Sequence, residues 1–246
     1  MNRLKVLFLS LIAMTFVYTS SYCQVYLGVQ GGYNFAQSSI LLATDDNNAV
    51  FPASTKALYG SLGKGYTFGG TFGVRVNPYM GIELTVAGTF GGSYKEIDTY
   101  PTYIVTTTYE SSIITVSPTI LLSAGPENFT PYVKFGGVFA FPSATIISSG
   151  VYHNIKWEFS GNIPIGFTGS FGVMTNVLDW MKIYLEASST NYSWIPDEES
   201  YVNKFTGDNK IFRLEDSVDG SKDDVALAPA FPLSNIGLKM GMLFRL

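Results

Sequence analysis

Residues 79–90 read YMGIELTVAGTF, and this stretch decides the class of fold. Small or polar residues, with Glu83 at their centre, alternate along it with five apolar residues: Met80, Ile82, Leu84, Val86 and Phe90. This period of two predicts a β-strand with one apolar face and one small or polar face. Whether lipid or water meets the apolar face therefore decides both the fold and the role of Glu83.

The same alternation recurs along the whole chain. Each segment is long enough for the roughly 9–11 residues of a tilted membrane strand. One such segment is a weak signal, but a series of them predicts a β-barrel that crosses a membrane. The eight segments lie at residues 25–35, 66–76, 79–90, 113–122, 129–141, 163–173, 181–189 and 236–246.

The connections between these segments alternate between short and long. The short ones are residues 77–78, 123–128 and 176–179, and the long ones are residues 37–61, 93–111, 142–162 and 189–233. This pattern is typical of an eight-stranded antiparallel up-and-down transmembrane β-barrel with short periplasmic turns and long extracellular loops. Pro118 lies within one strand, where a closed barrel has no free edge, so we expect a β-bulge there.

Composition favours the same class. Only 14% of the residues are charged, against about 25% in ordinary soluble domains. A soluble sandwich or lipocalin-like barrel is the alternative, but its second face would be exposed to water. Here that face is mostly glycine, serine, threonine and alanine, which suits the narrow interior of a barrel better. The net charge of −4 gives no indication of nucleic-acid binding.

The first residues read MNRLKVLFLSLIAMTFVYTSSYCQ, which has the layout of a secretory signal peptide. We expect residues 1–23 to be removed and residues 24–246 to form an outer-membrane barrel domain. Cleavage after Ser21 and acylation of Cys23 remain alternatives. Cys23 is the one cysteine, so the mature chain would have no disulfide and no thiolate ligand. We expect no metal and no cofactor.

Four motifs resemble the PorT-like outer-membrane β-barrel proteins typical of the Bacteroidetes, which are similar in architecture to the OmpA and OmpX barrels. They are GVQGGYNF at 28–35, GIEL at 81–84, YLEA at 184–187 and GLKMGMLFRL at 237–246. The resemblance covers essentially the whole mature chain. It implies an outer-membrane location in a Gram-negative cell and about eight strands, and it brings no catalytic residues.

The small, polar face also carries charged residues, which we expect inside the barrel. A turn centred on Pro78 would place Gly73 opposite Glu83, with Arg75 as the diagonal neighbour and expected partner of Glu83. These charges form either a packed structural network or the lining of a narrow pore. The predicted set is Arg75, Glu83, Lys134, Lys182, Glu186 and Lys239.

The sequence favours a non-enzymatic outer-membrane protein with a structural or interaction role through its extracellular loops. The first alternative is a narrow, low-conductance, porin-like pore. The second is a lipid-modifying enzyme that uses His153 with Ser148, Ser149 or Ser160. Expected partners are outer-membrane lipid, lipopolysaccharide and a protein or surface ligand at the loops, and the protein should be a monomer. The alternating residues 102–109 predict an exposed edge for strand addition.

Overall fold

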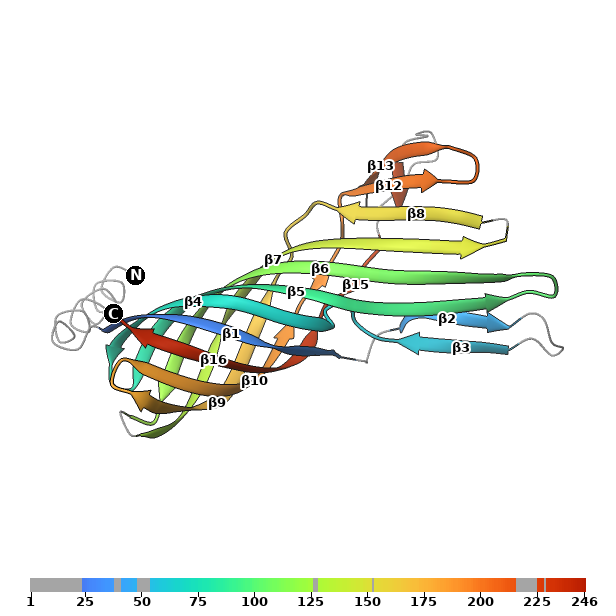
Figure 1. The fold of residues 1–246 in the computed structure, drawn as a ribbon. Coiled ribbons are helices and arrows are strands. Elements are labelled where there is room, and N and C mark those ends of the chain that lie inside the picture. Colours follow the sequence, from blue (N-terminus) through green and yellow to red (C-terminus); the bar gives the residue numbers. More distant parts are fainter. Residues whose placement is uncertain are drawn as a thin grey trace, which may run out of the picture.

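The computed structural model describes residues 24–37, 41–47, 54–125, 128–151, 153–215, 225–227 and 229–246. Eight strands form a closed antiparallel barrel, in which each strand pairs with the next and the last pairs with the first (Figure 1). The barrel strands are β1 (Gln24–Ala36), β4 (Gly65–Asn77), β5 (Met80–Thr99), β6 (Ile104–Ser123), β7 (Phe129–Gly150), β9 (Ile165–Leu178), β10 (Met181–Asn191) and β16 (Asn235–Arg245). The predicted eight-stranded fold is therefore confirmed.

Eight shorter strands lie outside the membrane part of the wall or at its rim. They are β2 (Leu41–Asn47), β3 (Ser54–Tyr59), β8 (His153–Ser160), β11 (Ser193–Trp194), β12 (Glu198–Asn203), β13 (Asn209–Glu215), β14 (Val225–Leu227) and β15 (Phe231–Pro232). Within the described residues, no helix is long and apolar enough to cross a membrane. Residues 1–23, the predicted signal peptide, lie outside the described part of the chain.

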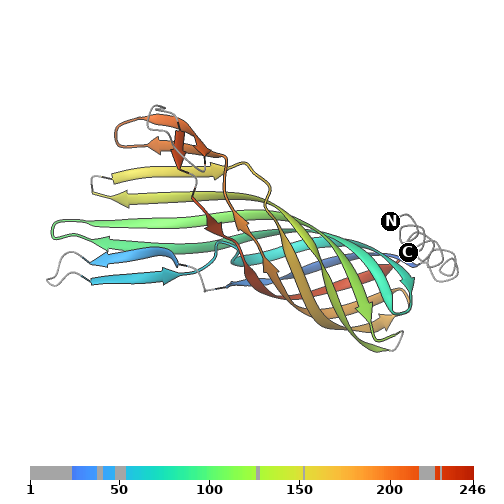
Figure 2. The ribbon, with the colours of Figure 1, turned by 180° about the vertical axis from the view of Figure 1, so that it is seen from behind.

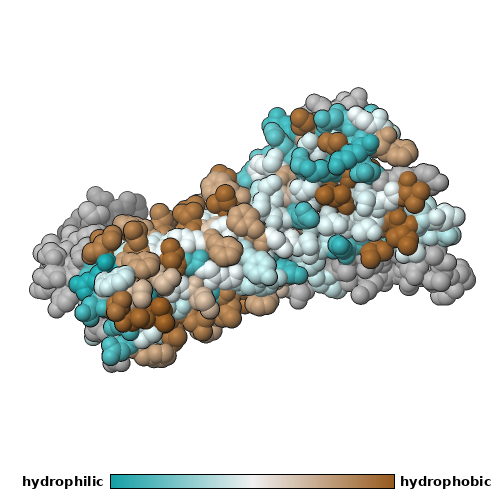
Figure 3. Space-filling view, in the orientation of Figure 1, coloured by the Kyte–Doolittle hydropathy of each residue, from teal (hydrophilic) through white to brown (hydrophobic). Residues whose placement is uncertain are grey.

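The barrel wall has its apolar side chains on the outside. On β5, Leu84 and Val86 are 44% and 47% exposed, whereas Glu83, which directly precedes Leu84, is 1% exposed. Hydrophobic side chains cover much of the visible wall of the barrel, while the far end of the molecule is more hydrophilic (Figure 3). A water-soluble barrel would show the reverse arrangement. The soluble alternative is therefore wrong, and the outer face of the wall meets lipid.

One half of the wall continues beyond the membrane. β4 begins only at Gly65, opposite Gly91, but the β5–β6 ladder runs on to Thr99, and β7 stays paired with β6 as far as Gly150. The strands β8, β12 and β13 extend this sheet sideways (Figures 1 and 2). We call residues 93–99, 104–112 and 142–150, with β8, β12 and β13, the projecting sheet.

Much of each of the four predicted long loops is therefore strand. Residues 37–61 contain β2 and β3. Residues 93–111, 142–162 and 189–233 contain ladders in which β8 pairs with the barrel strand β7, β12 pairs with β8, and β13 pairs with β12. The predicted free edge at residues 102–109 is wrong for β6, since β7 pairs with it from Val105 onward. Threonine, tyrosine and isoleucine, which favour strands, are frequent in these segments.

The predicted bulge at Pro118 is also wrong. The β6–β7 register is the same on both sides of it, with Val116 opposite Phe139 and Thr119 opposite Gly136. The ladder simply omits Ser117 and Pro118, so the missing N–H of proline shifts no residue. An irregularity occurs instead on β5 between Thr89 and Gly92, where the wall passes into the projecting sheet.

Lysine substitution at two positions on the outer face of β5 tests where the membrane ends. Val86→Lys should lower the free energy of unfolding by about 2–4 kcal/mol, because the charge would face lipid. Ile97→Lys, on the same face within the projecting sheet, should change it by less than about 0.5 kcal/mol. Urea unfolding in lipid vesicles measures both values. Equal losses would contradict this placement of the membrane.

Candidate functional site in the barrel interior

A buried ionic cluster links three strands across the barrel interior. Lys134 on β7 places its Nζ 2.8 Å from Oε2 of Glu83 on β5 and 3.0 Å from Oε2 of Glu186 on β10. All three side chains are buried. One ammonium group thus bridges two carboxylates from different parts of the wall, an arrangement that is tolerable in the interior only when the charges are paired.

Three tyrosines complete the cluster. The Tyr26 hydroxyl donates to Oε1 of Glu83 at 2.6 Å, and the Tyr132 hydroxyl donates to Oε2 of Glu186 at 3.1 Å. Lys134 Nζ also lies 5.1 Å from the ring centre of Tyr132 and 5.2 Å from that of Tyr184. The ammonium is therefore surrounded by carboxylates and aromatic faces, both of which stabilise a cation.

Each of these tyrosines lies across a glycine on the neighbouring strand and reaches an acceptor on the strand after it. A Cβ at Gly73 would lie 2.2 Å from the Tyr26 ring, so only glycine permits this ring position. The corresponding distances are 2.7 Å at Gly172 and 2.6 Å at Gly241. The three sets are Tyr26–Gly73–Glu83, Tyr132–Gly172–Glu186 and Tyr184–Gly241–Gln30.

The expected partner of Glu83 requires a correction. The β4–β5 register places Gly73 opposite Glu83 as predicted, but Lys134, not Arg75, forms the ion pair with Glu83. Arg75 donates instead to the carbonyl oxygen of Pro78 at 3.2 Å and to Oγ of Ser123 at 3.1 Å. Arg75 also donates to Sδ of Met174 at 3.1 Å, so it joins the periplasmic end of β4 to β6 and β9. The ion-pair partner of Glu83 is instead Lys134 on β7.

The two remaining predicted residues lie on the interior face without joining this bridge. Lys239 on β16 is directly opposite Glu186 on β10, and Lys182 is opposite Leu243 near the periplasmic end. Neither lysine forms an ion pair within 4.0 Å among the residues that the structure describes. Of the six predicted residues, the structure thus brings Glu83, Lys134 and Glu186 into contact.

Side chains close the interior at both ends. Near the periplasm, the cluster packs among buried apolar and aromatic residues that include Leu121, Met174 and Leu243. Above it, a chamber of about 60 Å³ is lined mainly by threonine and serine hydroxyls together with Lys239. One water needs about 10–15 Å³ of such accessible volume, so this chamber has room for several waters.

A hydrophobic plug covers this chamber on the extracellular side. The chain before β4 and the chain before β16 meet there, and Leu62 N donates to the carbonyl oxygen of Pro232 at 2.9 Å. Trp194 and Leu233 are 0% exposed, and the Trp194 indole donates to the carbonyl oxygen of Gly161 at 2.9 Å. Sequence reasoning missed this plug, although its apolar residues interrupt an otherwise polar stretch.

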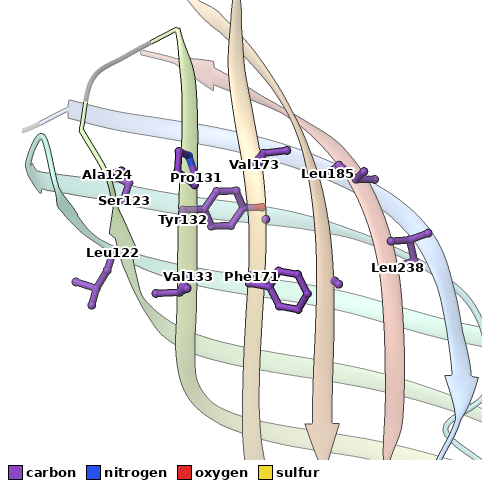
Figure 4. Close-up of a pocket in the computed structure, with 12 residues that line it drawn as sticks. Leu122, Ser123, Ala124, Pro131, Tyr132, Val133, Phe171, Val173, Leu185 and Leu238 are labelled. Carbon is purple, nitrogen blue, oxygen red and sulfur yellow. The ribbon is translucent and has the colours of Figure 1, made fainter.

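An apolar groove lies on the outer wall of the barrel, not in the interior. It has a volume of about 670 Å³, and its outward residues come from β6, β7, β9, β10 and β16 (Figure 4). These residues include Leu122, Val133, Phe171, Leu185 and Leu238, which are all exposed on the membrane face. A groove in this position is in contact with lipid and offers no water-accessible site.

The structure assembles no metal-binding group from its described residues. His153 begins β8, but its side chain is among those that are not described. The Ser148 hydroxyl accepts a hydrogen bond from Thr107 at 3.2 Å, and Ser160 lies at the opposite end of β8. No group of three or more histidine, cysteine, aspartate or glutamate side chains in the described ranges could hold a metal ion.

Neither a family model nor a curated protein matches this sequence. Among solved structures, a major outer membrane protein from Thermus thermophilus is 12% identical, with 90% of this chain and 99% of that chain covered and a TM-score of 0.50. Neisserial surface protein A is 9% identical, with 90% and 97% covered and a TM-score of 0.49. The outer membrane protease OmpT from Escherichia coli is 10% identical, with 91% and 96% covered and a TM-score of 0.41.

At such low identities the likeness concerns the fold alone. The match to the Thermus thermophilus protein, together with the closed wall and its apolar exterior, defines this chain as a small outer-membrane β-barrel protein.

Two glycines on β4 provide a matched test of the tyrosine arrangement. Gly73→Val should lower the free energy of unfolding by at least about 2 kcal/mol, because the new side chain displaces the Tyr26 ring from Glu83. Gly70→Val, which points outward with its nearest contact at 3.6 Å, should have little effect. Urea unfolding in vesicles compares them. A Gly73 variant as stable as the Gly70 variant would contradict the geometry.

The ionic cluster is tested by removing its cation. Lys134→Met leaves two buried carboxylates without their shared partner, so we expect a loss of about 3–5 kcal/mol in the free energy of unfolding. The triple variant Glu83→Gln, Lys134→Met, Glu186→Gln should recover much of this loss because no buried charge remains. The same unfolding measurement applies. If the triple variant is as unstable as Lys134→Met, and lower pH does not restore the stability of Lys134→Met, then the bridge does not stabilise this region.

Proposed function

We propose that this protein is a non-enzymatic outer-membrane barrel that acts by interaction, through the surface that it presents outside the cell. The observation that supports this proposal is the contrast between its two halves. The interior is filled at both ends, whereas half of the wall continues beyond the membrane as a broad sheet. The barrel holds that sheet at the cell surface, and the sheet makes the contacts.

The filled interior argues against the narrow pore. Ions would have to pass the plug around Trp194 and Leu233, the small chamber, and then the bridge formed by Lys134. In an eight-stranded barrel, side chains of ordinary size fill the cross-section. We therefore assign the interior charges to packing and to fixing the positions of the strands.

The remaining parts of the proposal concern the export of the chain, the family to which it belongs, and the molecules that surround it in the membrane. Residues 1–23 act as a cleaved signal peptide, and the four motifs quoted above support a place among the PorT-like barrels. Outer-membrane lipid and lipopolysaccharide surround the apolar wall, and the protein is a monomer. The partner at the projecting sheet is a protein or another surface ligand.

Measurements of ionic current across planar bilayers distinguish this function from that of a pore. Purified wild-type protein should give no ion steps, and the variant Trp194→Ala, Leu233→Ala, which loosens the plug, serves as the positive contrast. Steady wild-type steps that disappear in Lys134→Met and Lys239→Met would overturn the proposal in favour of a pore. Folding of every variant is checked by heat-modifiable mobility.

The enzymatic alternative requires a separate test. His153→Ala in the native host should leave the lipid A profile unchanged, because we assign no chemistry to this residue. Mass spectrometry of extracted lipid A measures the outcome, with Asn154→Ala on the same strand as the control. A lipid A species that is lost only in the His153 variant would show that the protein is an enzyme.

A further inference from the structure

A row of mostly aromatic side chains crosses the projecting sheet on the face that continues the barrel interior. Each member is directly opposite the next across a strand pair, so the row runs at right angles to the strands. We call it the lumen-side row, and it consists of Tyr94, Tyr109, Ile146, Trp157, Tyr201 and Lys210. At about 4.8 Å between strands, its five intervals span about 24 Å.

The aromatic and aliphatic side chains of the lumen-side row are half-buried, whereas Lys210 at its end is exposed. Tyr94, Tyr109, Ile146 and Trp157 pack against the plug, and Trp157 meets Tyr201 edge to face with ring centres 6.1 Å apart. Packing fixes the rings in place, so a partner would bind to a surface that is already ordered. A preformed surface reduces the entropy lost on binding.

The face around this row is acidic. Glu96 and Asp98 on β5 and Glu199 on β12 share it, and Lys210 lies at its end. Glu199 lies between Phe159 and Phe212 on the neighbouring strands. Burial raises the pKa of the Glu199 carboxyl, and none of the described residues forms an ion pair with it.

One ring of the row already holds a cation. Lys64 Nζ lies 5.3 Å from the ring centre of Tyr94, while none of the described cations occupies the faces of Tyr109, Trp157 or Tyr201 in the same way. Ammonium and guanidinium groups are attracted to such faces, most strongly to tryptophan. Half-buried aromatic rings beside acidic side chains are therefore complementary to positive charge.

The opposite face of the same strands differs in charge. Lys156 and Glu158 on β8 form an ion pair with each other, and on the same face Glu198 of β12 is directly opposite Arg213 of β13. The acidic character is thus confined to the lumen-side face. This difference provides a matched control within one sheet.

We propose that the lumen-side row binds an extended, positively charged peptide segment of a partner protein. Its lysine or arginine side chains lie over Tyr109, Trp157 and Tyr201 and pair with Glu199. At about 3.3 Å per residue, roughly seven extended residues cover the row. This inference rests on the proposed interaction function and specifies the chemistry of the partner.

The probe is a fluorescent ten-residue peptide of alternating lysine and serine, added to the full-length protein in nanodiscs and followed by fluorescence anisotropy. We expect saturable binding that weakens with added sodium chloride. Glu199→Gln and Trp157→Ala should each raise the Kd by about tenfold. Glu158→Gln, on the other face of β8, should leave the Kd within about twofold. Glu199→Gln preserves shape, so its effect does not depend on refolding.

Four results would overturn the inference. The first two are the absence of saturable binding of the basic peptide and equally tight binding of a glutamate–serine peptide. The third is an equal loss of affinity for the basic peptide in Glu199→Gln and Glu158→Gln. The fourth is complete displacement of the basic peptide by spermine at equal charge concentration. The last would identify a small polyamine as the occupant. If bilayers stay silent while any of these results appears, the interaction function stands and only this partner is wrong.

Discussion

Every backbone N–H and C=O of a chain in lipid must find a partner within the protein, and the other features of this structure depend on that constraint. Eight strands satisfy it by closing β16 on β1. Closure at eight strands leaves an interior just wide enough for side chains to fill. The glycine, tyrosine and charged residues of the polar face therefore serve mainly to fill the barrel interior. The unusual composition of this face follows from the small cross-section of an eight-stranded barrel.

Within that interior, Glu83 is explained by the residues around it. Tyr26 reaches it only because Gly73 has no side chain, and Lys134 reaches it from across the barrel. Such contacts join strands that are distant in the chain and so help to fix the relative positions of all parts of the wall. Buried charges are poor sources of stability in themselves, but they restrict which arrangement of strands can form.

The sequence predicted what depends on neighbouring strands and failed where contacts cross the barrel. The alternation around Leu84 gave the correct faces, and the Pro78 turn gave the correct register. Arg75 was assigned to Glu83 because it is the nearest cation in that register. The alternation of residues along a strand gives no information on the contact that Lys134 makes from across the barrel. The strand β8 was missed although Trp157 and Phe159 alternate with charged residues, because its position in a long connection suggested a loop.

The central claim is that the barrel is a closed support and that its projecting sheet is the accessible surface. Single cysteines in a Cys23→Ser background test it most directly, with one at Thr119 in the interior chamber and one at Tyr201 on the sheet. A water-soluble maleimide applied to protein in vesicles reports their accessibility. The account predicts rapid labelling of Tyr201→Cys and negligible labelling of Thr119→Cys. Labelling of both at similar rates would show an open interior and contradict the account.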